Sequence, residues 1–416
     1  MNKITLYIVG AVTALTGLTS LTINQQQGSV PANLTLPQGF SAVIVADSLG
    51  PVRHLAVTAN GNIYVKENSI RNRKGLYYLT DQNHDGYFET KTGFGDYPGT
   101  GIKIKNGYLY SSSNSAIYRY KLNAKNEVID TENPELLVKG LVDKRQDNSK
   151  AFVVDDHNNL YVAVGSYSDA CREKGTIVGI PGCPLLDSVG GVWKFKADKP
   201  NQTFADGERF ATGVKNSVGI DVNPVTKTIF ATQHGRSLDN SYPQYYTAKQ
   251  VAQLPAEALY ELHQNANAGW PFAYYDNFQN KYVQSPEFGG DGKRSPDVKY
   301  LDPAVIIPAH FAPNDLLFYT GKMFPVRYRN GAFMAFHAQS PEMKKGYLVA
   351  FVPFKNGKAV GKYEIFADDF SPREQGNLNF KYRPCGLAQG PDGALYVADD
   401  VKGTVFKITY KAGSNK

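Results

Sequence analysis

The sequence predicts an all-β protein, a six-bladed β-propeller of four-stranded blades that is closed by an N-terminal strand in the last blade. One strand–turn–strand unit recurs six times along the 416 residues, and a further strand follows each copy. The chain also holds 27 Tyr and 22 Phe beside 39 Gly and 23 Pro, which is typical of short strands joined by turns. A β-sandwich is the alternative, but so regular a repeat favours a propeller.

The recurring unit is an apolar run, a tight turn and an alternating strand. Its copies begin at His54, Gly101, Ala151, Gly219, Cys385 and, in a looser form, Leu316. The turns carry Asn-Gly, Asp-Gly or His-Asn-Asn, residues that tolerate positive φ and suit hairpins. We therefore expect each copy to form the two inner strands of one blade.

A third strand follows each copy. These strands begin at Gly75, Ala116, Gly191, Ala258, Gly346 and Gly403. Phe40–Ala46 precedes the first copy and has no blade of its own, so we expect it to pair with Gly403–Tyr410 and to leave no open sheet edge. Long insertions interrupt the repeats at 167–189, 236–256 and 265–315, and we expect them to overhang the face that binds ligands.

The N-terminal segment differs from the repeats. Lys3 is the only charge before Ile23, and a polar run of Asn and Gln ends the apolar stretch. This is typical of a secretory signal peptide or of an uncleaved N-terminal membrane anchor, and no A-x-A site decides between them. We therefore divide the chain into this segment with a short linker, 1–29, and a propeller, 30–412, and expect a periplasmic or extracellular protein.

Charge and cysteine content narrow the function further. The formal net charge is +7 without a run of Lys or Arg, so nucleic acid is a poor fit and a small anionic ligand fits better. Cys171 and Cys183 flank a Gly/Pro-rich loop and are expected to form a disulfide after export. Cys385 lies in a strand-like run and is expected to be a buried thiol.

Polar residues gather where inner strands end, and these ends converge on the axis of a propeller. They are Ser166, Gln233–Arg236, His337 and Asp399–Asp400, with Lys215–Asn216, Pro308–Asn314 and Lys381–Pro384 close by. Each of them alone could be a strand cap, but the whole set favours a site on the axis.

An ordered set of motifs runs through these strand ends: GTGIKIKNGYLYSSSN, FATGVKNSVGIDVNP, FATQHGRSLD, NAGWPFAYYD, IPAHFAPNDLLFYTG and YRPCGLAQGPDGALYVADD. From about residue 35 onward the chain resembles the soluble glucose/sorbosone dehydrogenases, six-bladed propellers that use pyrroloquinoline quinone (PQQ) and Ca²⁺. The resemblance implies an oxidoreductase that transfers hydride from a sugar-like alcohol or aldehyde to the quinone, with an electron acceptor that the sequence does not identify.

The resemblance also implies cofactor-binding residues. Gln233 falls on a PQQ contact, and His234 and Gly235 fall on the segment whose main-chain carbonyls bind calcium. The other residues expected around PQQ are Lys150, Asp239, His310, Lys381 and Arg383.

The catalytic positions depart from the family pattern. Asp147 stands where the family has its proposed general base, a His, and a carboxyl group can act as a base if burial raises its pKa. Lys215–Asn216 replaces an Arg-Asn pair, so a planar guanidinium that can donate two parallel hydrogen bonds is replaced by the compact charge of an ammonium group. We therefore expect Asp147, Lys215 and Asn216 at the catalytic centre. Ala338–Glu342 replaces a Gly-Ser-Trp-Asn-Arg segment, which removes an aromatic wall and a cation.

Two other functions stay open. A calcium-dependent lactonase-type hydrolase needs Glu, Asp and Asn ligands on the axis. A non-catalytic binding propeller is favoured by the changes at Asp147 and Ala338–Glu342.

One motif stands apart from these functions. Asp81–Glu89 places oxygen ligands at alternate positions around Gly86, like the first half of a calcium loop. Thr92 occupies the place of the bidentate Glu, so we favour an acidic hairpin turn.

Overall fold

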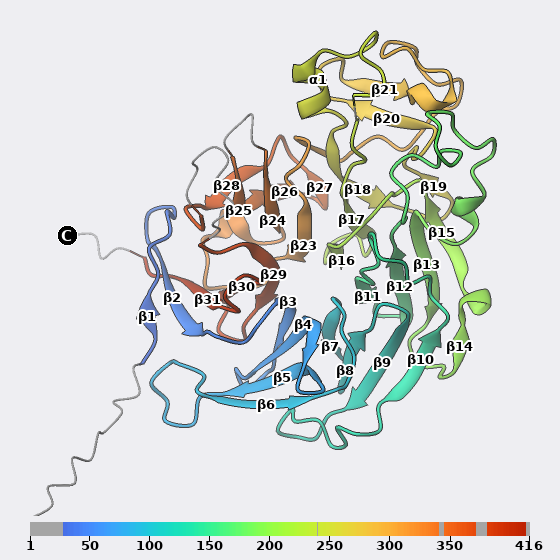
Figure 1. Ribbon diagram of the computed structural model, residues 1–416. Coiled ribbons are helices and arrows are strands. Elements are labelled where there is room, and N and C mark those ends of the chain that lie inside the picture. Colours follow the sequence, from blue (N-terminus) through green and yellow to red (C-terminus); the bar gives the residue numbers. More distant parts are fainter. Residues whose placement is uncertain (1–27, 239, 341–344, 372–380, 413–416) are drawn as a thin grey trace, which may run out of the picture.

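The computed structural model describes residues 28–238, 240–340, 345–371 and 381–412, which form six large sheets around an axis (Figure 1). The predicted six-bladed propeller is therefore confirmed. The innermost strands are β3 (Val52–Val57), β7 (Ile102–Lys105), β11 (Phe152–Val154), β16 (Ile220–Val222), β23 (Pro313–Phe318) and β29 (Pro384–Gln389). The second strands are β4 (Ile63–Arg71), β8 (Tyr108–Ser112), β12 (Asn159–Val164), β17 (Ile229–Gln233), β24 (Ala332–Ser340) and β30 (Leu395–Asp399).

The outer half of each blade continues the antiparallel order. The third strands are β5 (Lys74–Thr80), β9 (Ala116–Lys121), β13 (Gly191–Lys196), β18 (Glu257–Leu262), β25 (Lys345–Val352) and β31 (Val405–Tyr410). The fourth are β6 (Thr90–Phe94), β10 (Glu135–Lys139), β15 (Glu208–Thr212), β22 (Val305–Ile307), β28 (Glu364–Ala367) and β2 (Phe40–Ala46). Short strands β1 (Val30–Pro31), β14 (Gln202–Thr203) and β19 (Ala266–Asn267) extend three of the sheets.

Closure of the ring joins the two ends of the described chain. β2 pairs antiparallel with β31, and Phe40 lies opposite Tyr410 and Ile44 opposite Phe406. The predicted closing strand is therefore confirmed. Its first side chain is an anchor, because the Phe40 ring lies 4.8 Å from the ring of Phe324 and 5.0 Å from that of Phe366.

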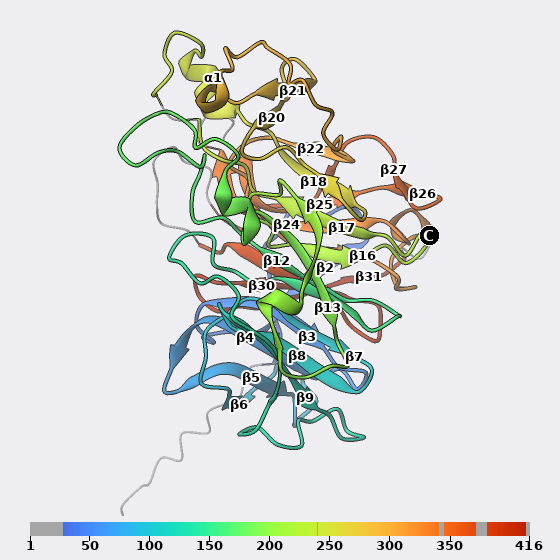
Figure 2. The ribbon, with the colours of Figure 1, turned by 90° about the vertical axis from the view of Figure 1, so that its right-hand side faces the viewer.

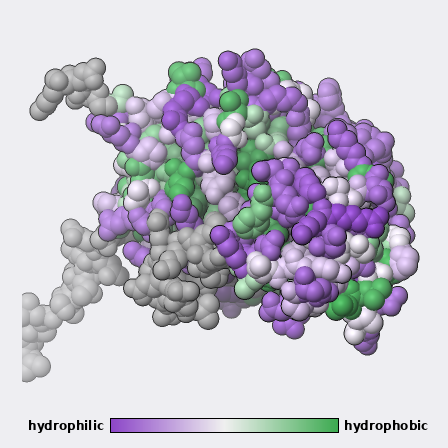
Figure 3. All heavy atoms as spheres, turned by 90° about the horizontal axis from the view of Figure 1, so that it is seen from above, coloured by the Kyte–Doolittle hydropathy of each residue, from purple (hydrophilic) through white to green (hydrophobic). Residues whose placement is uncertain are grey.

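The insertions build a projection on blades 3 and 4 (Figures 1 and 2). We call residues 240–256 and 268–300 the cap. It contains α1 (Ala248–Gln253) and the hairpin of β20 (Ala273–Asp276) and β21 (Lys281–Gln284). The cap has a small core formed by its residues Tyr242, Tyr246, Leu254, Tyr274 and Val283 together with Leu238, which precedes it. Figure 3 looks down on this side, where hydrophilic residues predominate and hydrophobic ones lie in small groups.

The N-terminal prediction falls on residues 1–27, outside the described residues. Among the residues that are described, no helix is long and apolar enough to cross a membrane. The division at residue 29 stays a prediction.

The Asp81–Glu89 loop forms a turn that its own carboxylates close. Asp81 Oδ2 accepts a hydrogen bond from the Gly86 N–H at 2.9 Å, and Asp85 Oδ1 accepts one from the Tyr87 N–H at 2.8 Å. This is the geometry of the acidic turn that we favour.

Phe40→Ala should lower the free energy of unfolding by about 3 kcal/mol, because it removes an aromatic side chain from the packed closure between blades 5 and 6. Urea titration followed by fluorescence measures this. Phe278→Ala is the matched control, since Phe278 is 44% exposed on a turn and should change stability by less than about 0.5 kcal/mol. Equal losses in both variants would contradict the anchoring role of Phe40.

Candidate functional site

The innermost strands begin, and the second strands end, on the same face of the propeller. Antiparallel pairing causes this, since each second strand runs back beside the first. The residues that gather there are Arg53, Asp147, Lys215, Asn216, His234, His337, Arg383 and Asp400, and we call them the axial site. It consists of two hydrogen-bonded groups.

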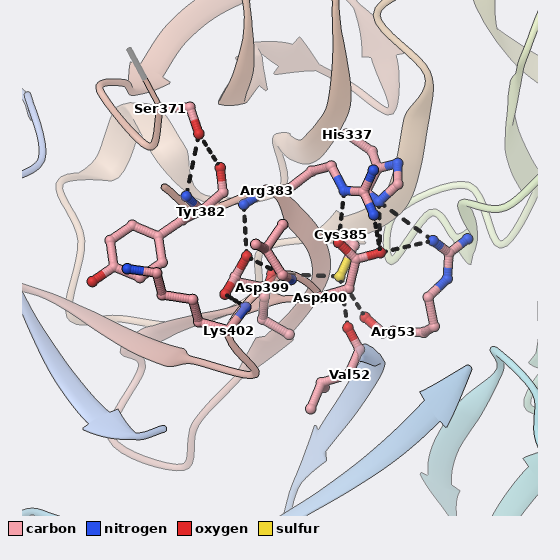
Figure 4. A network of polar contacts seen from close by, with 12 residues as sticks. Val52, Arg53, His337, Ser371, Tyr382, Arg383, Cys385, Asp399, Asp400 and Lys402 are labelled. Atoms are coloured by element: carbon pink, nitrogen blue, oxygen red, sulfur yellow. Dashed lines mark hydrogen bonds and ion pairs between the residues drawn. The ribbon is translucent and has the colours of Figure 1, made fainter. Parts of the chain in front are cut away.

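The first group is centred on the buried carboxylate of Asp400 (Figure 4). His337 Nε2 lies 2.8 Å from Asp400 Oδ2, and Arg53 NH1 lies 3.3 Å from the same oxygen. Arg383 donates from Nε to Oδ1 at 2.7 Å and from NH2 to Oδ2 at 3.1 Å. Burial alone would raise the pKa of Asp400, but hydrogen bonds from His337 and Arg383 outweigh it and hold this pKa well below its usual range. Asp400 is therefore a carboxylate.

His337 is neutral in this arrangement. Burial lowers its pKa to about 4, while the hydrogen bond to Asp400 opposes the shift and Arg53 adds to it. Because Asp400 accepts, we infer that Nε2 of His337 carries the proton and Nδ1 the lone pair. In the described part of the chain, Nδ1 has no hydrogen-bond partner, so it can accept a proton.

The second group is centred on Lys215. Its Nζ lies 2.6 Å from Asp147 Oδ2 and 2.9 Å from Asp169 Oδ1. Asn216 Nδ2 donates to Asp147 Oδ1 at 3.1 Å. The three predicted catalytic residues are thus in contact with one another. Burial alone would lower the pKa of Lys215, but the two carboxylates outweigh it and raise this pKa, so Lys215 is a cation.

His234 joins this group to blade 5. Its Nε2 lies 3.1 Å from the Pro313 carbonyl, and its Nδ1 lies 3.3 Å from Asn216 Nδ2. Burial, with a further contribution from Lys215, lowers the pKa of His234 to about 3. Both ring nitrogens are occupied, so this neutral imidazole positions its neighbours.

The disulfide loop also reaches the axial site. Cys171 and Cys183 are bonded to each other, as the sequence predicts. Two residues before Cys171, the Asp169 carbonyl accepts from the Trp270 indole N–H at 2.7 Å, while the Asp169 carboxylate meets Lys215. The loop therefore holds the negatively charged side chain of Asp169 against Lys215, the centre of the second group.

The remaining predicted residues lie at different distances from the axis. Gln233 Oε1 accepts from the Lys215 main-chain N–H at 3.1 Å. Lys150 is fully buried and donates to the Asn148 carbonyl at 2.7 Å, and burial lowers its pKa to about 8. Lys381 is exposed, with its Nζ 5.5 Å from the centre of the Tyr382 ring. Asp239 lies outside the described residues.

His310 lines a cavity beside the axial site, and the N–H of Gly235 bonds to Glu257 of the same lining. The cavity has a volume of about 900 Å³, and His310, Ala312, Ala338 and Glu257 are part of its lining. Glu257 accepts from the N–H groups of Phe311 and Ala312 at 3.0 and 2.8 Å. Burial raises the pKa of Glu257 to about 8, although these N–H groups and that of Gly235 oppose the shift.

The sequence analysis missed Arg53 and Glu257. Arg53 directly precedes the first repeat, which begins at His54, so its place at a strand start was a usable signal. Nothing local marks Glu257, which heads a third strand and has two of its partners, the N–H groups of Phe311 and Ala312, on the neighbouring blade.

PQQ is a quinone with three carboxylates, so a site for it needs cationic hydrogen-bond donors. The Nε of Arg53 is buried and has no hydrogen-bond partner in the described part of the chain, and the same holds for Oδ1 of Asn216. Arg383 is 30% exposed and can share its guanidinium with a further anion. The unpartnered Nε of Arg53 and the exposed part of the Arg383 guanidinium fit a ligand rich in carboxylates. For calcium, no cluster of three or more His, Cys, Asp or Glu exists among the described residues.

Known proteins share the fold of this chain. A family model described as TrAA12-like matches residues 34–411. This chain belongs to the TrAA12-like family. An uncharacterized protein of Borreliella burgdorferi is 24% identical over 414 residues, which is 96% of each chain.

Solved structures share the TrAA12-like fold. The calcium structure of the Trichoderma reesei family AA12 enzyme has a TM-score of 0.75 at 18% identity and covers 94% of this chain and 100% of its own. The holo PQQ domain of Coprinopsis cinerea pyranose dehydrogenase has a TM-score of 0.70 at 20% identity and covers 90% of this chain and 97% of its own. PQQ-bound aldose sugar dehydrogenase of Streptomyces coelicolor has a TM-score of 0.56 at 17% identity and covers 91% of this chain and 100% of its own. The predicted resemblance to PQQ-dependent sugar dehydrogenases is confirmed at the level of the fold.

Removing the disulfide should destabilise the protein. Its cysteines are 12 residues apart, and opening a loop of this length costs about 3 kcal/mol of unfolding free energy. Urea titration of a variant with both Cys171→Ser and Cys183→Ser measures the loss. Thiol titration of the unreduced, denatured chain is the companion measurement, and it should find one thiol, Cys385. Three thiols would refute the pairing.

A fall in pH should lower the free energy of unfolding through protonation of His337. The folded-state pKa of His337 lies below the ordinary value of 6.5, so the unfolded chain binds the proton first as pH falls. This contribution to stability is present above pH 6.5 and is lost toward pH 4. Between pH 7.5 and 5, His337 should account for a loss of about 2 kcal/mol of unfolding free energy.

His337→Gln should therefore flatten the dependence of unfolding free energy on pH. Urea titrations at pH 7.5 and 5 provide the measurement. His157→Gln is the control, because His157 is exposed on a turn. If His337→Gln and wild type lose stability in parallel, His337 does not have the environment described here.

Proposed function

We propose that this protein is an exported, PQQ-dependent oxidoreductase that oxidises an alcohol or aldehyde group of a sugar-like substrate. One observation carries the proposal: a His337–Asp400 pair lies between two arginines on the axis of a TrAA12-like propeller. The proposal includes export to the periplasm or beyond, from the character of residues 1–29, and an electron acceptor of unknown identity.

The axial cations would hold the cofactor. Arg53 and Arg383 offer donors to its carboxylates, and exposed Lys381 can reach an anion at the rim. When bound, PQQ supplies a quinone that accepts hydride. Calcium would bind through main-chain oxygens near His234 and Gly235, as the family resemblance implies.

His337 would be the general base. Its Nδ1 takes the proton from a substrate hydroxyl, and the resulting imidazolium donates from Nε2 to the Asp400 carboxylate. Asp400 stabilises that positive charge and fixes the tautomer, while Arg53 and Arg383 keep the carboxylate ionised. A neutral imidazole at pH 7 is the form that this step needs.

Asp147 is the alternative base. Its two oxygens are already engaged by Lys215 and Asn216. Nδ1 of His337, by contrast, has no hydrogen-bond partner among the described residues. Asp147 better suits a role in holding Lys215, so we place the proton transfer on His337.

Two other functions compete with this proposal. A lactonase-type hydrolase would need a metal-binding cluster, and no group of three acidic, His or Cys residues supports one in the described chain. A binding propeller would retain the arginines without turning over a substrate. Measuring PQQ binding and turnover separately distinguishes it from a dehydrogenase.

Adding PQQ and Ca²⁺ to the purified protein should give quinone absorbance changes and dye reduction with at least one sugar of a panel. Arg383→Ala should weaken PQQ binding by about 1.5–3 kcal/mol, the usual range for hydrogen bonds to charged groups. His337→Ala should bind PQQ but lower turnover by about 10²- to 10⁴-fold, the usual range for a general base.

The matched variant is Asp147→Asn. It should lower turnover less than tenfold if His337 is the base, whereas the opposite order of effects would assign the proton transfer to Asp147. PQQ binding without turnover on any sugar would support the binding propeller, and no PQQ binding at micromolar concentration would exclude the dehydrogenase.

A further inference from the structure

A second cavity lies on the outer side of the propeller, between blades 4 and 5. Its volume is about 630 Å³. We call it the interblade groove. β22 forms one wall, β25 and β28 form the other, and the turn of the β20–β21 hairpin contributes Asn277 and Asn280 to the lining. Its apolar lining includes Ile306, Pro308, Phe311, Leu348, Tyr363 and Ile365.

This groove is distinct from the cavity beside the axial site. Phe311 lines the interblade groove, whereas the preceding residue, His310, lines the other cavity. The rings of Phe311 and Phe336 lie 5.3 Å apart and form a packed boundary. A ligand in the groove therefore need not touch the axial residues.

Tyr363 gives the groove an aromatic surface. Its ring packs edge-on against Phe336 at 5.3 Å and remains partly accessible. Burial raises the pKa of Tyr363 to about 12, so its phenol keeps the proton at neutral pH. In the described part of the chain, this O–H has no hydrogen-bond partner and can donate to a ligand.

Four further polar side chains line the groove, and none is an acid: Asn277, Asn280, Lys345 and Lys362. None of them makes a side-chain hydrogen bond or ion pair with another described residue. Oδ1 of Asn277 is buried without a partner. A buried acceptor of this kind costs free energy unless a ligand or water satisfies it. The groove thus combines unused amide, hydroxyl and ammonium groups.

This chemistry identifies a class of ligand. The apolar face of a sugar ring packs against an aromatic ring, and its hydroxyls match amides and a phenol. Two ammonium groups in a lining that includes no carboxylate favour a ligand that carries negative charge. We propose that the interblade groove is a second saccharide-binding site, specific for a sugar unit that bears a carboxylate.

A simple acyl chain fits less well. It would use the apolar lining but would leave both amides and the phenol without hydrogen-bond partners. Covering a polar group without giving it a partner costs free energy. A uronic acid unit satisfies the apolar, hydroxyl and cationic features together.

Calorimetric titration without PQQ tests the proposal, with trigalacturonate as the acidic probe and maltotriose as the neutral one. Trigalacturonate should bind at least tenfold more tightly, and its affinity should fall when salt is raised from 0.05 to 0.5 M, since screening weakens contacts between exposed charges. Lys362→Met and Tyr363→Ala should each weaken binding about tenfold or more.

The controls are Lys125→Met and Tyr245→Ala, which change an exposed lysine and an exposed tyrosine outside the groove and should leave the affinity unchanged. Equal affinity for both probes would overturn the charge preference. No binding, or binding insensitive to Tyr363→Ala, would overturn the site, and tighter binding of laurate would assign it to acyl chains. Because PQQ is absent, none of these results bears on the proposed oxidoreductase.

Discussion

The buried carboxylate of Asp400 organises the centre of this propeller. It receives Arg53 from blade 1, His337 from blade 5 and Arg383 from its own blade. A carboxylate that is 4% exposed is costly to bury unless charged donors surround it, and each arginine is costly to bury without an anion. The blades therefore contribute complementary charges to one point, and loss of Asp400 would leave both arginines without their shared anion.

Closure of the ring makes that convergence possible. β2 completes the last blade, so the first and last blades meet without an open edge. The strand starts of distant repeats then face a common axis. The same geometry brings Lys215 to Asp147, although 68 residues separate them in the chain. These residues lie in or next to the ends of blade strands, so the packing of the blades sets the distances between them.

The insertions make further contacts with the axial site. The disulfide loop carries Asp169 to Lys215, and Arg172 of the same loop meets Glu287 of the cap. Arg236 reaches both oxygens of Glu287, at 2.5 and 2.6 Å. Burial alone would raise the pKa of Glu287, but the two arginines outweigh it and lower this pKa. The cap and the disulfide loop are thus tied together by a buried ion triad, which keeps Asp169 in place over the second group of the axial site.

The sequence by itself determined the architecture and the region of the site. Period-two strands and their Asn-Gly or Asp-Gly turns are local signals, so six blades, the closing strand Phe40–Ala46 and the polar strand ends could all be predicted. The Cys171–Cys183 pair followed from a shared loop. Only the tertiary structure decided which charges meet. Arg53 lies 347 residues from Asp400 and 284 from His337, and Glu257 finds its donors 54 and 55 residues away on the next blade. A pKa depends on burial and on neighbours at such separations, so the neutral His337 and the engaged Asp147 had no signature in the local pattern.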